Sequence, residues 1–519
     1  MTVVGFWLSV LQQRCMQNNL RRIGLLLAVC FFASLAAAAS TWQRLETDDF
    51  TIYSDASGKD IKDFAVNYAA FRQVLNDLFL PVGHKSSAST LVLFKRAGLL
   101  HRYGPISKGG DQNFLTFSTQ VDGSALLALA LSGDQDRACE VAFEFETIFA
   151  IQRAGCSFPI WVSQGTGMVL SSLKVQKGKC TMGADTAGNS MIFHGSNELL
   201  PWDKFFLTGR DSDDYKGKTH AGIFHAQAWA LMHWVLLSQK HPREAFTTLT
   251  TRIREKNFIE AVEDTTGVKA KEFTSLIARH LNGRSKYYEC VFDEQKVRAG
   301  FNLIPAPEAE VHVQLANLLA GAERYDEADA ELKQALALAP EAACVKEAAA
   351  RQASQNERKE EAVKLYRDAL VAGTKNPIAY LFSAKARIDE YASSGSDYGG
   401  GGGPSTEVAI GEIKKALELN PSSMEAYRLL GRAFYILPQL TEERLAELTP
   451  ALVSGADGCG VRFYRALLYE RLGKLDLCAS DLRIILEDRD ISQWTRCSVQ
   501  DRLVMIQRWK KELERRSGS

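Results

Sequence analysis

The feature that most constrains this chain is a 34-residue period in its C-terminal part. One set of apolar and small residues follows Pro305, and the same offsets recur in a second set. The first set is Leu315, Ala316, Leu319, Ala328, Leu332, Ala335 and Pro340, and the second is Ala349, Ala350, Ala362, Tyr366, Ala369 and Thr374. Small residues let paired helices approach closely, and larger apolar residues fill the contact with the next pair. Because one helical pair cannot bury its apolar face alone, the pattern predicts a stacked array of helical hairpins.

Further units follow with looser matches. The third ends in Ala409, Ile413, Ala416 and Pro421. Its Ala409 lies 47 positions after Ala362, and the surplus falls in the glycine-rich stretch 393–404, which we expect to be a flexible insertion. A fourth unit carries Tyr427, Leu430, Gly431 and Phe434, and a fifth carries Tyr464, Tyr469, Gly473, Cys478 and Leu482. Residues 491–519 predict a charged helix that covers the last exposed apolar seam, through Leu503, Ile506, Trp509 and Leu513.

The 34-residue period, with small residues at Ala328 and Ala362, resembles that of tetratricopeptide repeats. The resemblance covers 307–490 and implies an all-α superhelical solenoid. Such a solenoid has a concave groove for a peptide or protein segment, so a protein or peptide partner is expected.

The first forty residues have the organisation of an export signal. Arg21 and Arg22 precede an almost uninterrupted apolar run from Ile23 to Ala39, which ends in small residues. Together these features predict a signal peptide over 1–39, with cleavage near Ala39, and a periplasmic or secreted protein. The alternative is a membrane anchor retained through the same segment. No other stretch is long enough for a membrane helix, so no stable span is expected after cleavage.

An exported protein can form disulfides, and the cysteines beyond the signal form an even set. We expect bridges to come from two closely spaced groups, Cys139, Cys156 and Cys180, and Cys459, Cys478 and Cys497, with a connectivity that the spacing leaves open. No C-x-x-C pair occurs, so neither a redox motif nor a zinc knuckle is indicated.

The charges of the chain balance, with 62 Lys and Arg residues against 62 Asp and Glu residues. There is no basic field that would attract nucleic acid, and nucleic acid is therefore not an expected partner.

Residues 40–290 differ from the repeats in their pattern of apolar residues. The runs 50–53, 90–94 and 114–117 predict strands, and 61–80, 136–153 and 227–237 predict helices. The pattern indicates an α+β domain, a sheet followed by helices, joined to the repeats by a linker over 291–306.

This first domain resembles the gluzincins, the thermolysin-like zinc peptidases, as found in secreted bacterial proteins that join such a domain to tetratricopeptide repeats. The resemblance rests on the order of four segments: Trp42–Ser54, the helix around Glu144, Pro159–Gly165 and Phe224–His233. In such peptidases an H-E-x-x-H helix supplies two zinc ligands and a general base, and a second helix supplies a third ligand.

The ligand positions implied by the resemblance are all replaced. Phe143 and Thr147 stand where the two histidines are expected, Gln164 stands where the third ligand is expected, and only the base position keeps its residue, Glu144. Phe has no donor atom, and neutral Thr and Gln are poor zinc ligands. We therefore expect no metal, no cofactor and no catalytic residue, only a vestigial site whose cleft includes Glu144, Gln164 and His225.

Three other interpretations of these residues remain open. Glu144 and Glu146 could form a different metal site with His220, His225 or His233, although residues two apart on a helix face different ways. Ser163 or Cys156 could serve a hydrolase, although no G-x-S-x-G pattern is present. His225 and His233 could line a cleft, or His233 could be a hydrogen-bonded core residue beside Trp229 and Trp234.

The sequence as a whole predicts an exported, non-catalytic scaffold with a degenerate peptidase-like domain. The alternative is a divergent hydrolase that acts on peptide or cell-wall material.

Overall fold

The computed structural model describes residues 42–80, 87–106, 114–153, 158–195, 199–216, 221–238, 241–282, 287–393, 404–421, 423–437, 440–453, 459–487 and 493–517. The expected signal peptide, nearly all of the glycine-rich stretch, Cys156 and His220 lie outside these residues. Within them, no helix combines the length and the apolar character that a membrane crossing needs.

The strands form two sheets. They are β1 (Gln43–Glu46), β2 (Phe50–Ser54), β3 (Ser89–Phe94), β4 (Thr116–Val121), β5 (Ser124–Ala130), β6 (Lys174–Gln176), β7 (Lys179–Met182), β8 (Tyr288–Val291) and β9 (Leu303–Pro305). The larger sheet has the order β4-β5-β3-β2-β1-β9, and the smaller has the order β6-β7-β8. In the larger sheet β2, β3 and β5 are parallel, and β1, β4 and β9 are antiparallel to their neighbours.

The helices fall into two groups along the chain. The first group is α2 (Gly58–Phe79), α3 (Ala97–Tyr103), α4 (Gln135–Arg153), α5 (Ile160–Ser171), α6 (Asn189–Gly195), α7 (Trp202–Leu207), α8 (Asp213–Lys216), α9 (Ala221–Leu237), α10 (Pro242–Glu255), α11 (Phe258–Thr266), the 3-10 helix η1 (Ala270–Glu272), α12 (Phe273–Asn282) and α13 (Glu294–Ala299). The second group is α14 (Glu308–Gly321), α15 (Tyr325–Leu338), α16 (Ala343–Gln355), α17 (Lys359–Val371), α18 (Pro377–Ser393), α19 (Pro404–Leu419), α20 (Met424–Ile436), α21 (Glu442–Ala446), α22 (Pro450–Val453), α23 (Cys459–Arg471), α24 (Leu475–Glu487) and α25 (Gln493–Ser517).

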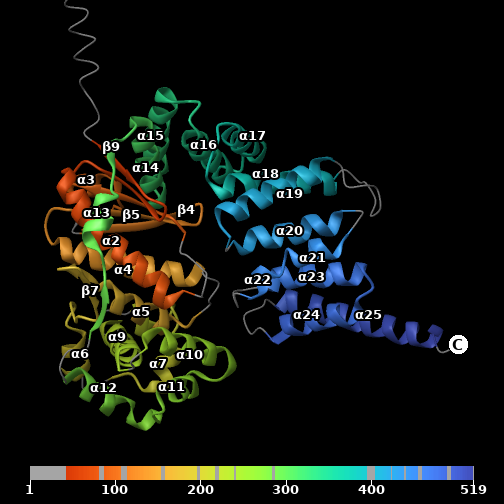
Figure 1. Ribbon diagram of the computed structural model, residues 1–519, viewed down its shortest axis with the longest axis horizontal. Coiled ribbons are helices and arrows are strands. Elements are labelled where there is room, and N and C mark those ends of the chain that lie inside the picture. Colours follow the sequence, from red (N-terminus) through yellow and green to blue (C-terminus); the bar gives the residue numbers. More distant parts are fainter. Residues whose placement is uncertain are drawn as a thin grey trace, which may run out of the picture.

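The six-stranded sheet is buried on both faces, because successive residues of its central strands point to opposite sides. Leu91 and Leu93 of β3 belong to the core shared with α2 and α4. Val92 and Phe94 belong to a second core, shared with α3 and α14. Figure 1 shows the sheet between these two helical layers, with α5 to α12 beyond α4. The strands expected at 50–53 and 90–94 and the three expected helices are thus confirmed, while the strand expected at 114–117 runs instead from Thr116 to Val121.

The first helix of the repeats is part of the N-terminal core. Leu315, Leu318 and Leu319 of α14 are buried in the same cluster as Val92 and Phe94. The array is therefore packed directly on the sheet.

The expectation of a linker over 291–306 is corrected for the same reason. This stretch contains α13 and β9, and β9 is the edge strand that pairs with β1, with Gln43 opposite Pro305. Arg298 of α13 also binds Asp63 of α2, with Nη2 2.6 Å from Oδ1. The N-terminal unit extends to Pro305, because a strand too short to stand out by its pattern completes the sheet.

A disulfide joins Cys180 of β7 to Cys290 of β8, 110 residues apart in the chain. Cys180 belongs to one of the two groups expected to supply bridges, and its partner Cys290 lies outside both groups. Among the described cysteines of those groups, Cys139, Cys478 and Cys497 are free thiols. Cys180 and Cys290 face each other because β7 and β8 pair in register there, a pairing that residue spacing does not reveal.

The repeat units predicted by the 34-residue period are confirmed as helical hairpins. The pairs are α14 with α15, α16 with α17, α18 with α19, and α23 with α24. In the fourth unit, the helix that follows α20 is divided into α21 and α22. Ala328, Ala362 and Ala409 are all buried, as expected of contacts between paired helices.

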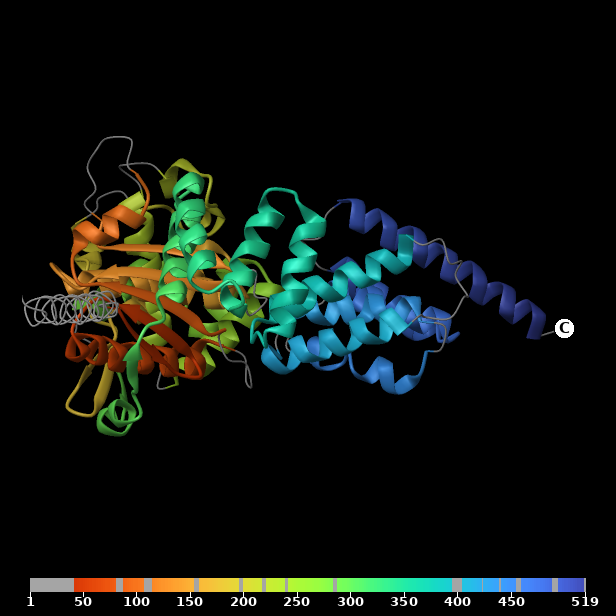
Figure 2. The ribbon, with the colours of Figure 1, turned by 90° about the horizontal axis from the view of Figure 1, so that it is seen from above.

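The turn inside each hairpin also repeats. Glu323 and Glu357, which are separated by one repeat period, both have positive φ, at 61° and 60°. The amide that follows each turn donates to the preceding helix, Arg324 N to Leu319 O at 2.9 Å and Arg358 N to Ala353 O at 2.8 Å. This closure satisfies carbonyls at the helix end and fixes the length of the turn, so the period is the same in both units. The array ends in α25, the helix nearest the C-terminus in Figure 2.

Candidate functional site

The residues expected to line a cleft, Glu144, Gln164 and His225, lie close together where α4 meets α5. Nε2 of Gln164 on α5 donates a hydrogen bond to Oε1 of Glu144 on α4. The hydroxyl of Tyr215 on α8 lies 3.4 Å from Oε1 of Gln164. The ring of Tyr215 stands edge-on to that of His225, with centroids 5.4 Å apart. The expected proximity of Glu144 and Gln164 is confirmed, and Tyr215 connects them to His225.

Burial changes the protonation of two of these groups. Burial raises the pKa of Glu144 to about 7, although the charge of Arg137 and the hydrogen bond from Gln164 both oppose this shift. Burial also lowers the pKa of His225, which favours its neutral form. In the described part of the chain, Nε2 of His225 has no hydrogen-bond partner. The cluster therefore combines a carboxyl whose pKa is about 7 with an imidazole whose neutral form is favoured.

Phe143 and Thr147 face the other way. The ring of Phe143 stacks on Phe71 of α2 with centroids 4.4 Å apart, and it also contacts Tyr68. Oγ1 of Thr147 donates to the carbonyl of Phe143 within α4, at 2.7 Å. Phe143 and Thr147, which were expected in the vestigial site with Glu144 and Gln164, therefore lie on another side of α4. The residues of α4 that share a face with Glu144 stand four positions away, at Glu140 and Ile148.

Glu146 does not join Glu144. Its Oε1 lies 2.6 Å from Nη1 of Arg72 and accepts from the Ser89 hydroxyl at 2.7 Å, and both charged side chains are almost fully buried. This pair fixes α4 against α2 and β3. A metal site built on both glutamates is thus excluded, as the two-residue spacing predicted.

The remaining candidates have structural roles where the structure describes them. One ring nitrogen of His233 lies 2.8 Å from Nε2 of His280, the other lies 2.9 Å from the Gly183 carbonyl, and the ring packs on Trp229. His233 is therefore a hydrogen-bonded core residue, which is the second of the two interpretations that the sequence left open for it. The hydroxyl of Ser163 donates to the carbonyl of Ile160.

These residues do not fit zinc. Phe143 offers no donor, the Thr147 hydroxyl is used by the backbone, and the Gln164 amide is used by Glu144 and Tyr215. Within the residues that the structure describes, no group of three or more His, Cys, Asp and Glu side chains could hold a metal ion.

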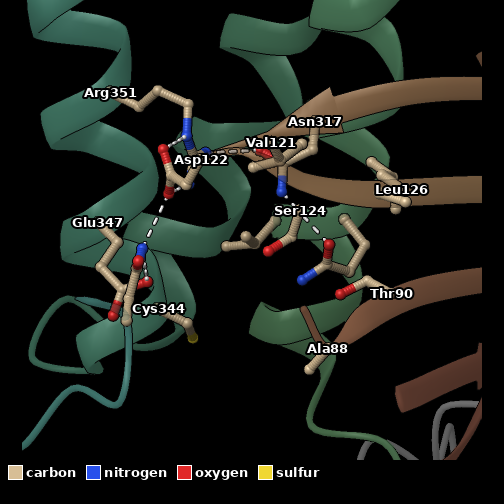
Figure 3. Close-up of a pocket in the computed structure, with 14 residues that line it drawn as sticks. Ala88, Thr90, Val121, Asp122, Ser124, Leu126, Asn317, Cys344, Glu347 and Arg351 are labelled. Carbon is tan, nitrogen blue, oxygen red and sulfur yellow. Dashed lines mark hydrogen bonds and ion pairs between the residues drawn. The ribbon is translucent and has the colours of Figure 1, made fainter. Parts of the chain in front are cut away.

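A second candidate site is a pocket of about 180 Å³ between the sheet and the first helices of two repeats. The face of the array that lines it, with Asn317 and Arg351, is called the inner face. Equivalent positions of two successive repeats line the pocket. Val313 and Glu347 are one repeat period apart, as are Asn317 and Arg351. The opposite wall comes from β3 and from the hairpin of β4 and β5 (Figure 3).

The tip of that hairpin is bound by the array. Asp122 accepts two hydrogen bonds from Arg351, from Nε at 3.0 Å and Nη2 at 2.7 Å. Nδ2 of Asn376, just before α18, donates to Asp122 at 2.8 Å, and Nη1 of Arg351 donates to Asn317 at 2.7 Å. Burial alone would raise the pKa of Asp122, but Arg351 and Asn376 hold it below its usual range. Figure 3 shows the Asp122 carboxylate facing the Arg351 guanidinium.

The hairpin turn has the geometry that brings Asp122 to its tip. Asp122 and Gly123 have φ of 50° and 69°, as in the two-residue turns whose twist suits a hairpin. This site was not expected from the sequence. An Asp-Gly pair between two alternating apolar runs was the available signal, together with polar residues at matching positions of adjacent repeats.

The geometry defines a protein of tandem helical hairpins of the tetratricopeptide type, joined to an α+β domain. No protein-family model matches the chain, and no curated protein matches it either. Solved structures similar to it include YrrB, a tetratricopeptide-repeat protein with an unusual peptide-binding site, at 17% identity over 38% of this chain and 93% of that one, with a TM-score of 0.31.

A second is TTC0263, a thermophilic tetratricopeptide-repeat protein of Thermus thermophilus, at 20% identity over 38% of this chain and 99% of that one, with a TM-score of 0.28. A third is the hetero-tetramer Cut9–Hcn1 of the APC/C, at 10% identity over 73% of this chain and 70% of that one, with a TM-score of 0.28.

Proposed function

We propose that this chain is an exported, non-catalytic scaffold that binds a protein or peptide partner through the inner face of its repeat array. The observation that carries the proposal is the docked hairpin. The array already holds a segment of the chain itself, through Arg351 and Asn376 on the Asp122 carboxylate.

The docked hairpin also indicates where a partner has room. The hairpin occupies the inner face of the first two units, along α14 and α16. The corresponding face of α18, α20 and α23 continues the array beyond it. These helices would offer the partner-binding surface.

The N-terminal domain would be a pseudo-peptidase that keeps the architecture and not the chemistry. Support comes from the α4–α5 contact, where Gln164 binds Glu144 directly and leaves no place for a ligand between them. The proposed role of this domain is to support the array, which packs on its sheet through α14.

Export is supported by the Cys180–Cys290 disulfide, since such bridges persist mainly in oxidising compartments. The proposed compartment is the periplasm or the cell exterior. Sequencing of the N-terminus from cell envelopes tests this: a start near Ser40 is expected, and an intact cytosolic chain would contradict it.

One observation favours the competing hydrolase. A carboxyl with a pKa of about 7 is suited to general acid–base work, and Glu144 is such a group. Such an enzyme would lose its activity on Glu144→Gln. A purified chain that cleaves peptide or cell-wall material, and loses that activity with this substitution, would overturn the scaffold proposal.

The direct test of the scaffold uses the full chain with a photo-crosslinking residue at one of two positions. Lys385 on α18 stands one repeat period after Arg351 and is expected on the same face of the array, and Lys364 on α17 is exposed elsewhere in the array. We expect a discrete partner adduct in the cell envelope from position 385 and none from position 364. Adducts of equal yield from both positions, or from neither, would contradict binding through the inner face.

A further inference from the structure

The inner face of the array carries a row of equivalent positions whose chemistry is repeated. Asn317, Arg351 and Lys385 follow one another at intervals of one repeat period. Arg432 lies 47 positions after Lys385, the same interval that separates Ala362 from Ala409, and so has the same position in the fourth unit. Three consecutive repeats therefore place a basic side chain at one point of their first helix.

The first basic residue of this row shows what the row binds. Arg351 is paired with the carboxylate of Asp122, which is delivered by an extended strand and its turn. Asn317, one repeat earlier, accepts from the same guanidinium and orients it. The chain thus contains its own example of a carboxylate bound on this row, presented by a hairpin turn.

The next two basic residues are more accessible or more weakly paired. The side chain of Lys385 is 55% exposed, and its nearest carboxylate, Asp389, is 3.8 Å away. Arg432 is 28% exposed and binds the same Asp389 at 2.7 Å. One carboxylate, itself 47% exposed, therefore faces two cations.

The neighbouring unit adds to this surface. Arg428, one turn before Arg432 on α20, is paired with Glu425 of its own helix, and both side chains are largely exposed. The ring of Tyr435, one turn after Arg432, lies 5.9 Å from the guanidinium of Arg471 on α23. The surface is basic and aromatic, with Asp389 and Glu425 as the acidic groups among these residues.

We propose that the inner face of the third and fourth repeats binds an acidic segment of a partner protein, whose carboxylates pair with Lys385 and Arg432 as Asp122 pairs with Arg351. The inference rests on the proposed scaffold function and specifies the chemistry of its partner. Asp389 occupies part of this site in the free protein and competes with the incoming carboxylates. Arginine and lysine on a groove wall give charge selectivity and a fast, salt-dependent association.

The test uses the full chain and three fluorescein-labelled peptides of twelve residues. The first alternates Asp with Thr, and in the others Asn or Lys replaces every Asp. Fluorescence anisotropy should show the Asp peptide binding about tenfold or more tightly than the Asn peptide at low salt, with the difference shrinking as salt is added. Binding of the Lys peptide should be weaker still.

Four variants sharpen the test. Lys385→Glu with Arg432→Glu should weaken binding of the Asp peptide about tenfold or more, and the neutral pair Lys385→Gln with Arg432→Gln should weaken it less. Asp389→Asn should strengthen it, since a competing carboxylate is removed. Lys364→Glu is the control. It changes the charge as much as one of the two glutamate substitutions and should leave binding unchanged. Thermal melting of each variant checks that it is folded.

Equal binding of the Asp and Asn peptides, or no response to the substitutions at Lys385 and Arg432, would overturn the inference. That outcome is distinguishable from failure of the scaffold. A chain that yields an adduct from position 385 but does not discriminate Asp from Asn remains a scaffold for a partner of other chemistry. A chain without that adduct is not such a scaffold.

Discussion

At the residue scale, the environment of Glu144 makes a specific prediction about pH. Burial between α4 and α5 raises the pKa of Glu144 from its ordinary 4.5 to about 7. A carboxyl whose pKa is raised on folding stabilises the fold below its unfolded value, and this contribution is lost as the pH rises to the folded value. Glu144→Gln removes the titration, so the stability of the variant relative to the natural chain should rise by on the order of 2 kcal/mol between about pH 4 and about pH 8.

Urea unfolding followed at both pH values measures this difference. Glu308→Gln is the matched control, because the Glu308 side chain is 61% exposed. Its relative stability should not change with pH. If the stability of Glu144→Gln relative to the natural chain did not change with pH, folding would not raise the pKa of Glu144.

The sequence predicted some of these residue positions and not others. The contact between Glu144 and Gln164 followed from two segments whose order the resemblance supplied. The side of α4 on which Phe143 lies did not follow, because both faces of this helix are buried and apolar residues stand on each. Asp122 was missed because its partners, Arg351 and Asn376, are more than two hundred residues away.

At the element scale, the β4–β5 hairpin should depend on the charge of Asp122. Asp122 has a positive φ of 50°, which Asn tolerates well, so Asp122→Asn changes the charge and little else. The substitution leaves the Arg351 guanidinium without its carboxylate. The pair is mostly buried, since the side chains of Arg351 and Asp122 are 19% and 13% exposed. We expect a loss of about 2 to 4 kcal/mol in stability, together with faster hydrogen exchange in β4, β5 and α16. Asp122→Ala should cost more, because Ala also disfavours that backbone conformation. Unchanged exchange in α16 would mean that the hairpin does not depend on this pair.

The repeats make a separate prediction about their helix pairs. Ala362 is fully buried where α16 meets α17, and Lys364, two residues later, is exposed. Ala362→Leu should overpack the contact and destabilise the chain by about 1 to 3 kcal/mol. Lys364→Leu should change stability by only a few tenths of a kcal/mol. Equal shifts in melting temperature would contradict the helix packing. This packing could be predicted from the sequence, because the 34-residue period identifies Ala328 and Ala362 as equivalent small residues.

At the scale of the whole molecule, the sequence misplaced the boundary between the two parts. The change in composition after Pro305 is real, but the structure continues across it. Ala306 is buried, β9 completes the sheet, and α14 lies on the sheet face. The sequence pattern shows where the composition changes, but it does not show which surface the next helix packs against.

Limited proteolysis of the full chain tests this continuity. Cleavage should be slow in 291–306, because β9 is hydrogen-bonded to β1 and Ala306 donates to the Trp42 carbonyl at 3.0 Å. The glycine-rich stretch 393–404, expected to be flexible from its composition, should be cut first. Rapid cleavage within 291–306 would instead restore the linker.

The junction between the array and the sheet can be tested at one atom. A Cβ added at Gly321, the last residue of α14, would lie 2.5 Å from Oγ1 of Thr119 on β4. Gly321→Ala should therefore force α14 away from β4 and destabilise the chain by about 1 to 3 kcal/mol. Gly411 is the matched control, a helical glycine of α19 with nothing within 4 Å of an added Cβ. Gly411→Ala should stabilise the chain by up to about 1 kcal/mol, because Ala is the better helix former. Thermal melting of the two variants should thus give shifts of opposite sign. If both raised the melting temperature, the array would not be fixed to the sheet at β4. The hairpin that β4 carries into the groove would then lose its rigid support.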